Sequence, residues 1–350
     1  MPTNSFLQSL LNWLSTWFGR PGNSPVPGSR AVTLTVNNTT EPVQVLSPRV
    51  LVVVFDPVWD RQTGQRLSQA PETAHWNRVD DLLAGYLADV EECSGGLVKY
   101  QVVERITLDH FPVKEDQFVY DGASYLQALR TGRYHAPDWM DYGRVLNELR
   151  LLQRVEQGDC DEVWFFGAPG FGFYESRMAG RGAFWCNAPA CENTESCHKR
   201  FVMMGFSYER GVGEMLEDLG HRAESILHYR WRTVPDRANL WKVFSRYDQV
   251  APGQAEVGMM HWAPNSVRDY DWGNSRVVST RADDWLNFPN LTGEIKTLNC
   301  SAWGKGDIRA HHKWWFTRLP KAPGRTNGVA NQWWRYVIDV NNPELNAAGP

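Results

Sequence analysis

Long apolar runs and basic runs are both missing from this 350-residue sequence. A membrane-spanning helix needs about 20 consecutive, mostly apolar residues, and no stretch of the chain reaches that length. The formal net charge is -4, whereas a nucleic-acid-binding domain usually carries a positive stripe. We therefore expect no transmembrane segment and no nucleic-acid partner.

Nucleotide-binding and zinc-peptidase motifs are missing as well. Residues 167–175 form a glycine-rich segment after an apolar run, but this segment has neither the glycine pattern of a dinucleotide-binding loop nor the lysine of a P-loop. Neither NAD nor ATP is predicted. The histidines do not follow the HExxH, HxxEH or metzincin arrangements, so function has to be argued from individual residues.

Cysteine and tryptophan usage bears on the compartment. The six cysteines permit disulfides without requiring them. Cys186, Cys191 and Cys197 lie close together but do not have the paired spacing of a zinc knuckle, so a loop pinned by a disulfide is favoured. The 17 tryptophans are unusually many for this length. These features favour a secreted or otherwise extracytoplasmic protein, although the N-terminus does not have the form of a standard signal peptide.

The chain is expected to divide into a short N-terminal segment, either a leader or a helix docked elsewhere, and one long domain. Residues 1–30 are predicted to form an amphipathic helix followed by a Pro-, Gly- and Ser-rich linker. Residues 31–350 are predicted to form a single α/β domain with a largely parallel central sheet and flanking helices. The loop-rich, Trp-rich part at residues 240–350 is expected to cover the site. The strands are predicted at residues 49–55, 99–106, 161–167 and 200–206, with helices at 79–92 and 142–157 between them.

A helix predicted at residues 208–229, with Ser207 as its N-cap, carries the main functional hypothesis. Its acids and histidines recur at steps of three and four, which places them within a sector of about 80°. These residues are Glu214, Glu217, His221, Glu224 and His228. Glutamate and histidine four residues apart can bind one divalent ion, typically zinc. We predict that Glu217 and His221 bind such an ion and that His261 is the third ligand, with the His311–His312 pair as second choice.

Two carboxylates of the same helix remain for catalysis. Glu214 or Glu224 would act as a general base toward water, or would orient a metal ligand. Substrate contacts are expected from the glycine-rich segment and from the later loops. The residues named for this role are Phe171, Tyr174, Glu175, Trp262 and Trp272.

The alternative interpretation is that the polar face of this helix is simply solvated, because the opposite face carries an apolar stripe. Two observations weigh against it. Gly213 and Gly220 flank the acidic sector, although each costs a helix about 0.8–1.0 kcal/mol relative to alanine, which predicts that another segment comes close to that edge. The face also has no lysine to pair with its glutamates.

The leading hypothesis is a metal-dependent, zinc-type hydrolase that acts on a glycan, glycoconjugate or peptide. One alternative is a non-catalytic carbohydrate-binding or adhesion protein that uses exposed tryptophans such as Trp314 and Trp334. A second is a serine hydrolase with Ser207 as nucleophile. It would need an acid, Asp269 or Asp271, and a histidine, His311 or His312.

Overall fold

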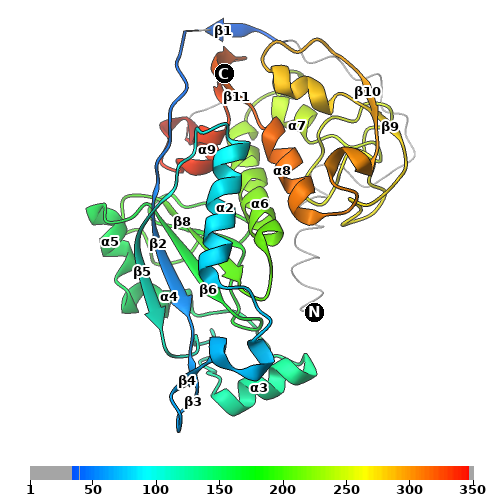
Figure 1. Ribbon diagram of the computed structural model, residues 1–350. Helices are drawn as coiled ribbons and strands as arrows, with labels where there is room; N and C mark the ends of the chain where they lie inside the picture. Colours follow the sequence, from blue (N-terminus) through cyan, green and yellow to red (C-terminus); the bar gives the residue numbers. More distant parts are fainter. Residues whose placement is uncertain (1–33, 39, 347–350) are drawn as a thin grey trace.

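The computed structural model describes residues 34–38 and 40–346 (Figure 1). The predicted N-terminal helix and linker therefore lie outside the described residues. The short strand β1 (Val36–Asn38) pairs antiparallel with β11 (Lys321–Thr326) near the C-terminus. None of the helices in the described part of the chain is long and apolar enough to cross a bilayer.

A mixed five-stranded sheet forms the centre of the fold, in the order β5-β2-β6-β8-β7. The first four strands in this order are parallel, and β7 joins the edge antiparallel to β8. This confirms the prediction of a mostly parallel sheet with flanking helices. Strands β2 and β6 are apolar and almost completely buried, which explains their near-continuous β-branched and aromatic sequences. The five strands are β2 (Arg49–Phe55), β5 (Gln101–Leu108), β6 (Glu162–Gly167), β7 (Ser176–Ala179) and β8 (Phe201–Ser207).

Helices cover both faces of this sheet. Helix α2 (Val79–Cys93) connects β2 to β5, whereas α4 (Tyr142–Glu148) and α5 (Leu151–Gln157) lie on the path back from β5 to β6. Right-handed crossovers that run in opposite directions place their helices on opposite faces. The single helix predicted at residues 142–157 is broken, because Arg150 adopts a left-handed backbone conformation with φ of 50°.

Smaller elements extend the carboxyl edge of the sheet, which is the lower end in Figure 1. They are β3 (Val58–Asp60), β4 (Gln65–Arg66) and helix α3 (Gly122–Thr131). Asp121 caps α3 by accepting a hydrogen bond from the Ser124 amide at 2.8 Å. These elements surround the ends of β2 and β5, the position at which open α/β sheets usually bind ligands.

The C-terminal part is rich in tryptophan, as expected, but it contains more regular structure than its composition indicates. Its elements are α7 (Leu240–Phe244), β9 (Val278–Thr280), β10 (Lys296–Leu298), α8 (Ile308–Arg318), β11, β12 (Val329–Gln332) and α9 (Trp334–Ile338). Trp241, Trp285, Trp315 and Trp333 pack on one another and on Phe244 in a buried aromatic cluster.

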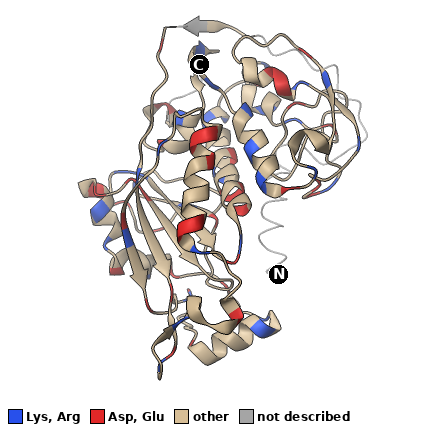
Figure 2. Ribbon diagram, in the orientation of Figure 1, with Lys and Arg blue, Asp and Glu red and all other residues tan. Residues whose placement is uncertain are grey.

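Charged side chains join α8 to α2. Figure 2 shows acidic residues along α2 and basic residues on α8. Asp89 of α2 is buried, and its carboxylate accepts from Arg309 at 2.6 Å and from Lys313 at 3.0 Å. A buried carboxylate needs such partners, because leaving it unpaired would cost several kcal/mol. These bonds attach the C-terminal part to the helix layer of the sheet.

Helix α6 (Val212–Trp231) lies between the sheet and the C-terminal part. Sixteen of its 20 residues are buried, including Glu217, His221 and Glu224. The solvated-face interpretation is therefore wrong. The predicted start was also wrong, because the N-cap is Gly211 and the Glu214 carboxylate satisfies its amide at 3.1 Å, so Ser207 stays in strand β8.

The predicted disulfide is not formed. All six cysteines lie within the described residues, and each is a free, buried thiol. Burial raises the pKa of Cys186 to about 11, so this thiol stays protonated at neutral pH and is a poor nucleophile. Ser176 instead donates a hydrogen bond to the Cys186 carbonyl oxygen.

Candidate metal centre

Glu217, His221 and His261 form a buried group whose ligand atoms all lie within 4.8 Å of one another. The Nε2 atoms of the two histidines are 2.9 Å apart. Glu217 Oε1 lies 2.9 Å from His261 Nε2 and 3.8 Å from His221 Nε2. A tetrahedral zinc ion with Zn–N bonds of about 2.0–2.1 Å would separate two ligand nitrogens by about 3.3 Å. The three side chains could therefore hold a metal ion after a shift of a few tenths of an ångström.

Both imidazoles are oriented by a carboxylate on the opposite side of the ring. His221 Nδ1 bonds to Glu224 Oε2 at 3.0 Å, and His261 Nδ1 bonds to Asp269 Oδ1 at 3.0 Å. Because an ionised carboxylate can only accept, each Nδ1 carries a proton, which leaves each Nε2 as the ring nitrogen that could bind a metal ion. Metal-binding histidines are typically oriented by such a partner.

This orientation requires a positive charge or a proton at the point where the three side chains meet. The two Nε2 atoms and a Glu217 oxygen converge there at hydrogen-bond distance. A cation or a proton on Nε2 has to lie between them, because three bare acceptors at such distances would repel one another. The chemistry of the group, with two imidazoles and one carboxylate, is that of a site for a divalent transition metal.

The pKa values follow from the same contacts. Burial alone would lower the pKa of His221, but its hydrogen bonds to Glu217 and Glu224 outweigh burial and raise it. Burial and the neighbouring His221 would lower the pKa of His261, and the bonds to Asp269 and Glu217 again raise it. Burial would raise the pKa of Glu217, but the two histidines lower it. The carboxylates thus favour positive charge at this point.

A tight turn presents His261 to helix α6. Met259 and Trp262 exchange backbone hydrogen bonds of 2.9 and 3.0 Å, which leaves Met260 and His261 at the tip. Gly258 precedes this turn with φ of 90°, and a Cβ at this position would lie 2.1 Å from the Trp262 carbonyl oxygen. Only glycine fits there without displacing the turn.

The two glycines of α6 allow this close approach. A Cβ on Gly220 would lie 2.0 Å from the Met260 sulfur, and one on Gly213 would lie 2.5 Å from Ile308 Cγ2 of α8. The predicted approach of other segments to this edge is therefore confirmed. Glu224 Oε1 also accepts the Met260 amide at 2.7 Å, so the carboxylate that orients His221 also anchors the turn that carries His261.

A pocket of about 390 Å³ opens onto the group of Glu217, His221 and His261 at the carboxyl end of β8. Its lining includes the predicted base Glu214, whose Oε2 accepts the Gly211 amide while Oε1 is left available. Glu224 does not line the pocket and is a positioning residue for His221. Ser207 and Arg210 complete the wall on the side of β8.

Of the residues predicted to contact substrate, the structure places Glu175 alone in the lining of this pocket. Phe171 is buried in the core against Phe55 and Tyr125, so its ring is unavailable to a ligand in this pocket. Trp272 is buried and donates to the Met260 carbonyl oxygen at 2.9 Å, which supports the turn. The rings of Tyr174 and Trp262 stack on Trp139 and Tyr247, respectively.

The residues named for the adhesion and serine-hydrolase hypotheses do not lie where those hypotheses require them. Trp314 and Trp334 are buried, so neither offers the exposed face that the adhesion hypothesis requires. His311 and His312 are fully buried beside Trp272, outside the group of metal ligands. Within the part of the chain that the structure describes, no hydrogen bond joins Ser207 to a histidine, and Asp269 bonds to His261 instead. The residues predicted for a serine triad are not assembled.

Three further residues belong to the site although the sequence reasoning did not assign them there. Asp269 was named only for a triad, and neither Asp218 nor Tyr270 was assigned a role by name. The Tyr270 ring packs on His261 with centroids 4.0 Å apart. Partial desolvation, Glu217 and Glu175 raise the pKa of the half-exposed Tyr270, so its hydroxyl remains a hydrogen-bond donor at neutral pH. Asp218 lies about 100° around the helix from Glu217, outside the predicted sector, so helical periodicity did not indicate it.

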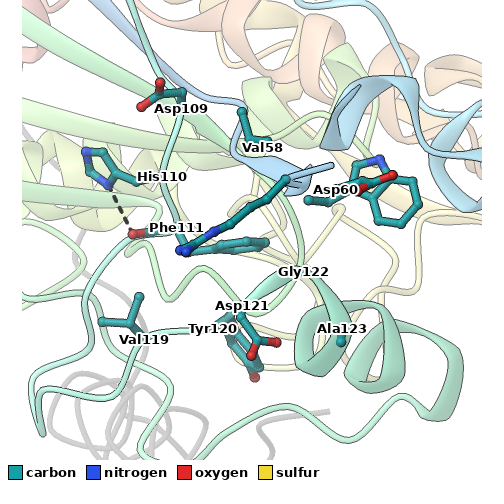
Figure 3. Close-up of a pocket in the computed structure, with 12 residues that line it drawn as sticks. Val58, Asp60, Asp109, His110, Phe111, Val119, Tyr120, Asp121, Gly122 and Ala123 are labelled. Carbon is teal, nitrogen blue, oxygen red and sulfur yellow. Dashed lines mark hydrogen bonds between the residues drawn. The ribbon is translucent and has the colours of Figure 1, made fainter. Parts of the chain in front are cut away.

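A larger pocket, of about 620 Å³, lies at the ends of β2 and β5. Figure 3 shows Asp60, Asp109, His110 and Asp121 around it. His110 bonds through Nδ1 to the Phe111 carbonyl oxygen at 3.1 Å and through Nε2 to Glu148 at 2.9 Å. Among the described residues, the carboxylates of this larger pocket do not converge with histidines on one point. The group of Glu217, His221 and His261 lies outside this pocket.

We compared the chain with protein-family models, with curated proteins and with solved structures. It matches none of them.

Proposed function

We propose that this protein is a metal-dependent hydrolase of the zinc type, acting on a glycan, glycoconjugate or peptide. The observation that carries the proposal is the convergence of the two Nε2 atoms and Glu217 Oε1 on one buried point beside a pocket. Catalytic zinc is typically held by three protein ligands of this kind and keeps one position open. A bound ion of this type acts as a Lewis acid and lowers the pKa of water to about 7.

The surrounding residues have the properties that hydrolysis needs. Glu214 lines the pocket with one oxygen held by the Gly211 amide, so the other oxygen can accept a proton from the attacking water. That proton then passes to the leaving group as the scissile bond breaks. Tyr270 can donate a hydrogen bond to the oxygen on which negative charge develops. The proposal requires neither a serine nor a cysteine nucleophile.

Metal analysis tests the proposal directly. The protein is purified without chelator, and its metal content is measured by mass spectrometry for the wild type, His221→Ala and His261→Ala. We expect about one equivalent of zinc in the wild type and loss from both variants. His198→Ala is the matched control, because His198 is an exposed histidine that pairs with Glu156 away from the pocket.

The identity of the metal is part of the same experiment. A set of two histidines and one carboxylate also serves non-haem iron, so iron in place of zinc would contradict the hydrolase. Absence of metal from the wild type, even after incubation with zinc, would contradict the metal centre itself. Hydrolysis of a mixed panel of peptide and glycoside substrates, abolished in Glu214→Gln while zinc is retained, is the expected second result.

A further inference from the structure

The pocket beside the metal centre has a surplus of negative charge. Its lining contains five carboxylates and one guanidinium group, that of Arg210. The carboxylates are Glu175, Glu214, Glu217, Asp218 and Asp269. Burial and the neighbouring Glu175 raise the pKa of Asp218. Even with Asp218 left out of the count, one divalent ion and Arg210 would together compensate only three of the remaining four charges. An anionic substrate would be repelled from such a pocket, whereas a cationic one would be attracted.

Asp218 is the carboxylate of this pocket that lacks a partner among the described residues. Its exposed fraction is only 9%, and it lines the pocket directly after Glu217 in the helix. Its carboxylate has no hydrogen bond or salt bridge to any residue that the structure describes. A buried carboxylate without a partner is costly, and native proteins retain such groups mainly at functional sites. The partner of Asp218 is therefore expected to come from the ligand.

Glu175 contributes a second carboxylate to the same wall. It is the last residue of the glycine-rich segment at residues 167–175, and Asn187 donates to its Oε2, which leaves Oε1 available. Glu175 is the strongest electrostatic neighbour of Asp218. Together these two residues offer acceptor oxygens beside the metal ligand Glu217.

The spacing of the carboxylates discriminates between two cationic ligands. A second metal ion needs several ligand atoms close together, and within the described residues the one such group of three is Glu217, His221 and His261. An ammonium group has three donors that reach separate acceptors at about 2.9 Å, and it does not need a closed cage. The arrangement of Asp218 and Glu175 therefore fits an ammonium group better than a second metal ion.

We propose that Asp218 and Glu175 bind a primary ammonium group of the substrate, next to the bond that is hydrolysed. This inference rests on the proposed function and specifies its substrate class. Two classes of compound carry such a group, a peptide with a free N-terminus and an amino sugar. The ammonium group positions the substrate and takes no part in the bond-breaking step.

A pair of hydroxamates tests the metal centre and the ammonium site separately. Leucine hydroxamate carries a metal-chelating group and a free amine, and N-acetyl-leucine hydroxamate carries only the chelating group. Their dissociation constants are measured by calorimetry with the zinc-loaded protein. We expect leucine hydroxamate to bind at least about tenfold more tightly, because pairing of a buried charge stabilises a complex more than exposed pairing does.

Variants assign this preference to the residues. Asp218→Asn has nearly the same shape and should remove most of the preference for the free amine while leaving the binding of N-acetyl-leucine hydroxamate unchanged. Glu175→Gln should weaken the preference in the same direction. Asp109→Asn is the matched control, because it removes an exposed carboxylate in the other pocket (Figure 3) and should leave the preference intact.

The possible outcomes distinguish the ammonium site from the metal centre. Equal binding of the two hydroxamates would overturn the ammonium site and leave the metal centre standing, whereas binding of neither would overturn both. A preference that survives in Asp218→Asn would overturn the assignment to Asp218. Displacement of leucine hydroxamate by leucinamide supports a peptide N-terminus and displacement by glucosamine supports an amino sugar; displacement by neither overturns the substrate class.

Discussion

Glu224→Gln tests whether the carboxylate that accepts from His221 Nδ1 sets the metal affinity of the proposed centre. Glu224 accepts from His221 Nδ1 at 3.0 Å and from the Met260 amide at 2.7 Å. Glutamine has the same shape but only one acceptor oxygen, so one of these two bonds must be lost, and the negative charge is lost as well. Loss of such a partner typically weakens metal binding 10- to 100-fold, which corresponds to about 1.4–2.7 kcal/mol.

The structure indicates where in this range the effect should lie. The Glu224 side chain is only 5% exposed, whereas that of Asp269, which orients His261, is 37% exposed. Because solvent screens the exposed pair, Glu224→Gln should fall near the upper end and Asp269→Asn near the lower end. Zinc affinity is measured by competition with a chromophoric chelator. Glu214→Gln is the control on the same helix, since Glu214 does not bond to either histidine. Unchanged zinc affinity in Glu224→Gln would refute the argument.

Three further predictions concern packing, a buried ion pair and pH. Gly220→Ala should weaken zinc binding because its Cβ would displace Met260. Gly213→Ala, whose Cβ would crowd Ile308 of α8 instead, should lower the melting temperature without that effect, and equal zinc affinities of the two variants would contradict this. Glu162→Gln should lower the free energy of unfolding in urea by about 3 kcal/mol or more, because it leaves the fully buried Arg222 without its carboxylate partner. A decrease below about 1 kcal/mol would be inconsistent with that burial. Burial raises the pKa of Glu256 to about 7, so between about pH 4.5 and 7 the folded state keeps a proton that the unfolded state releases. The free energy of unfolding of the wild type should therefore fall by up to about 3 kcal/mol as the pH rises through this interval. Glu256→Gln should escape this loss, so its melting temperature relative to the wild type should increase over that interval, and a constant difference would rule out the shifted pKa.

The sheet could be predicted because its strands carry a local signal. Strands buried on both faces have to be apolar throughout, and the run at residues 49–55 coincides with β2. The other three predicted strands begin and end within two residues of β5, β6 and β8. The break near Arg150 could not be predicted in this way, because no proline or glycine marks it and packing decides it.

The candidate site was partly accessible for a similar reason. Glu217 and His221 share a helix face, so helical periodicity alone places them together. His261 and Asp269 lie in loops, where no periodicity relates a side chain to a distant helix. Gly213 and Gly220 carried the additional signal, since glycine inside a helix indicates that something packs closely against it. Tryptophan content was a poor guide, because a count does not distinguish a core residue from an exposed one.

The position of α6 has a consequence for how the protein would respond to metal. The helix is enclosed by the sheet and by α2, α8 and α9, so its amides should be among the slowest to exchange with deuterium. His261 lies instead on a turn that backbone bonds between Met259 and Trp262 hold closed. Zinc should therefore slow deuterium uptake at residues 258–264 and leave uptake in α6 almost unchanged. The helix would serve as the fixed half of the centre and the turn as the half that the ion recruits.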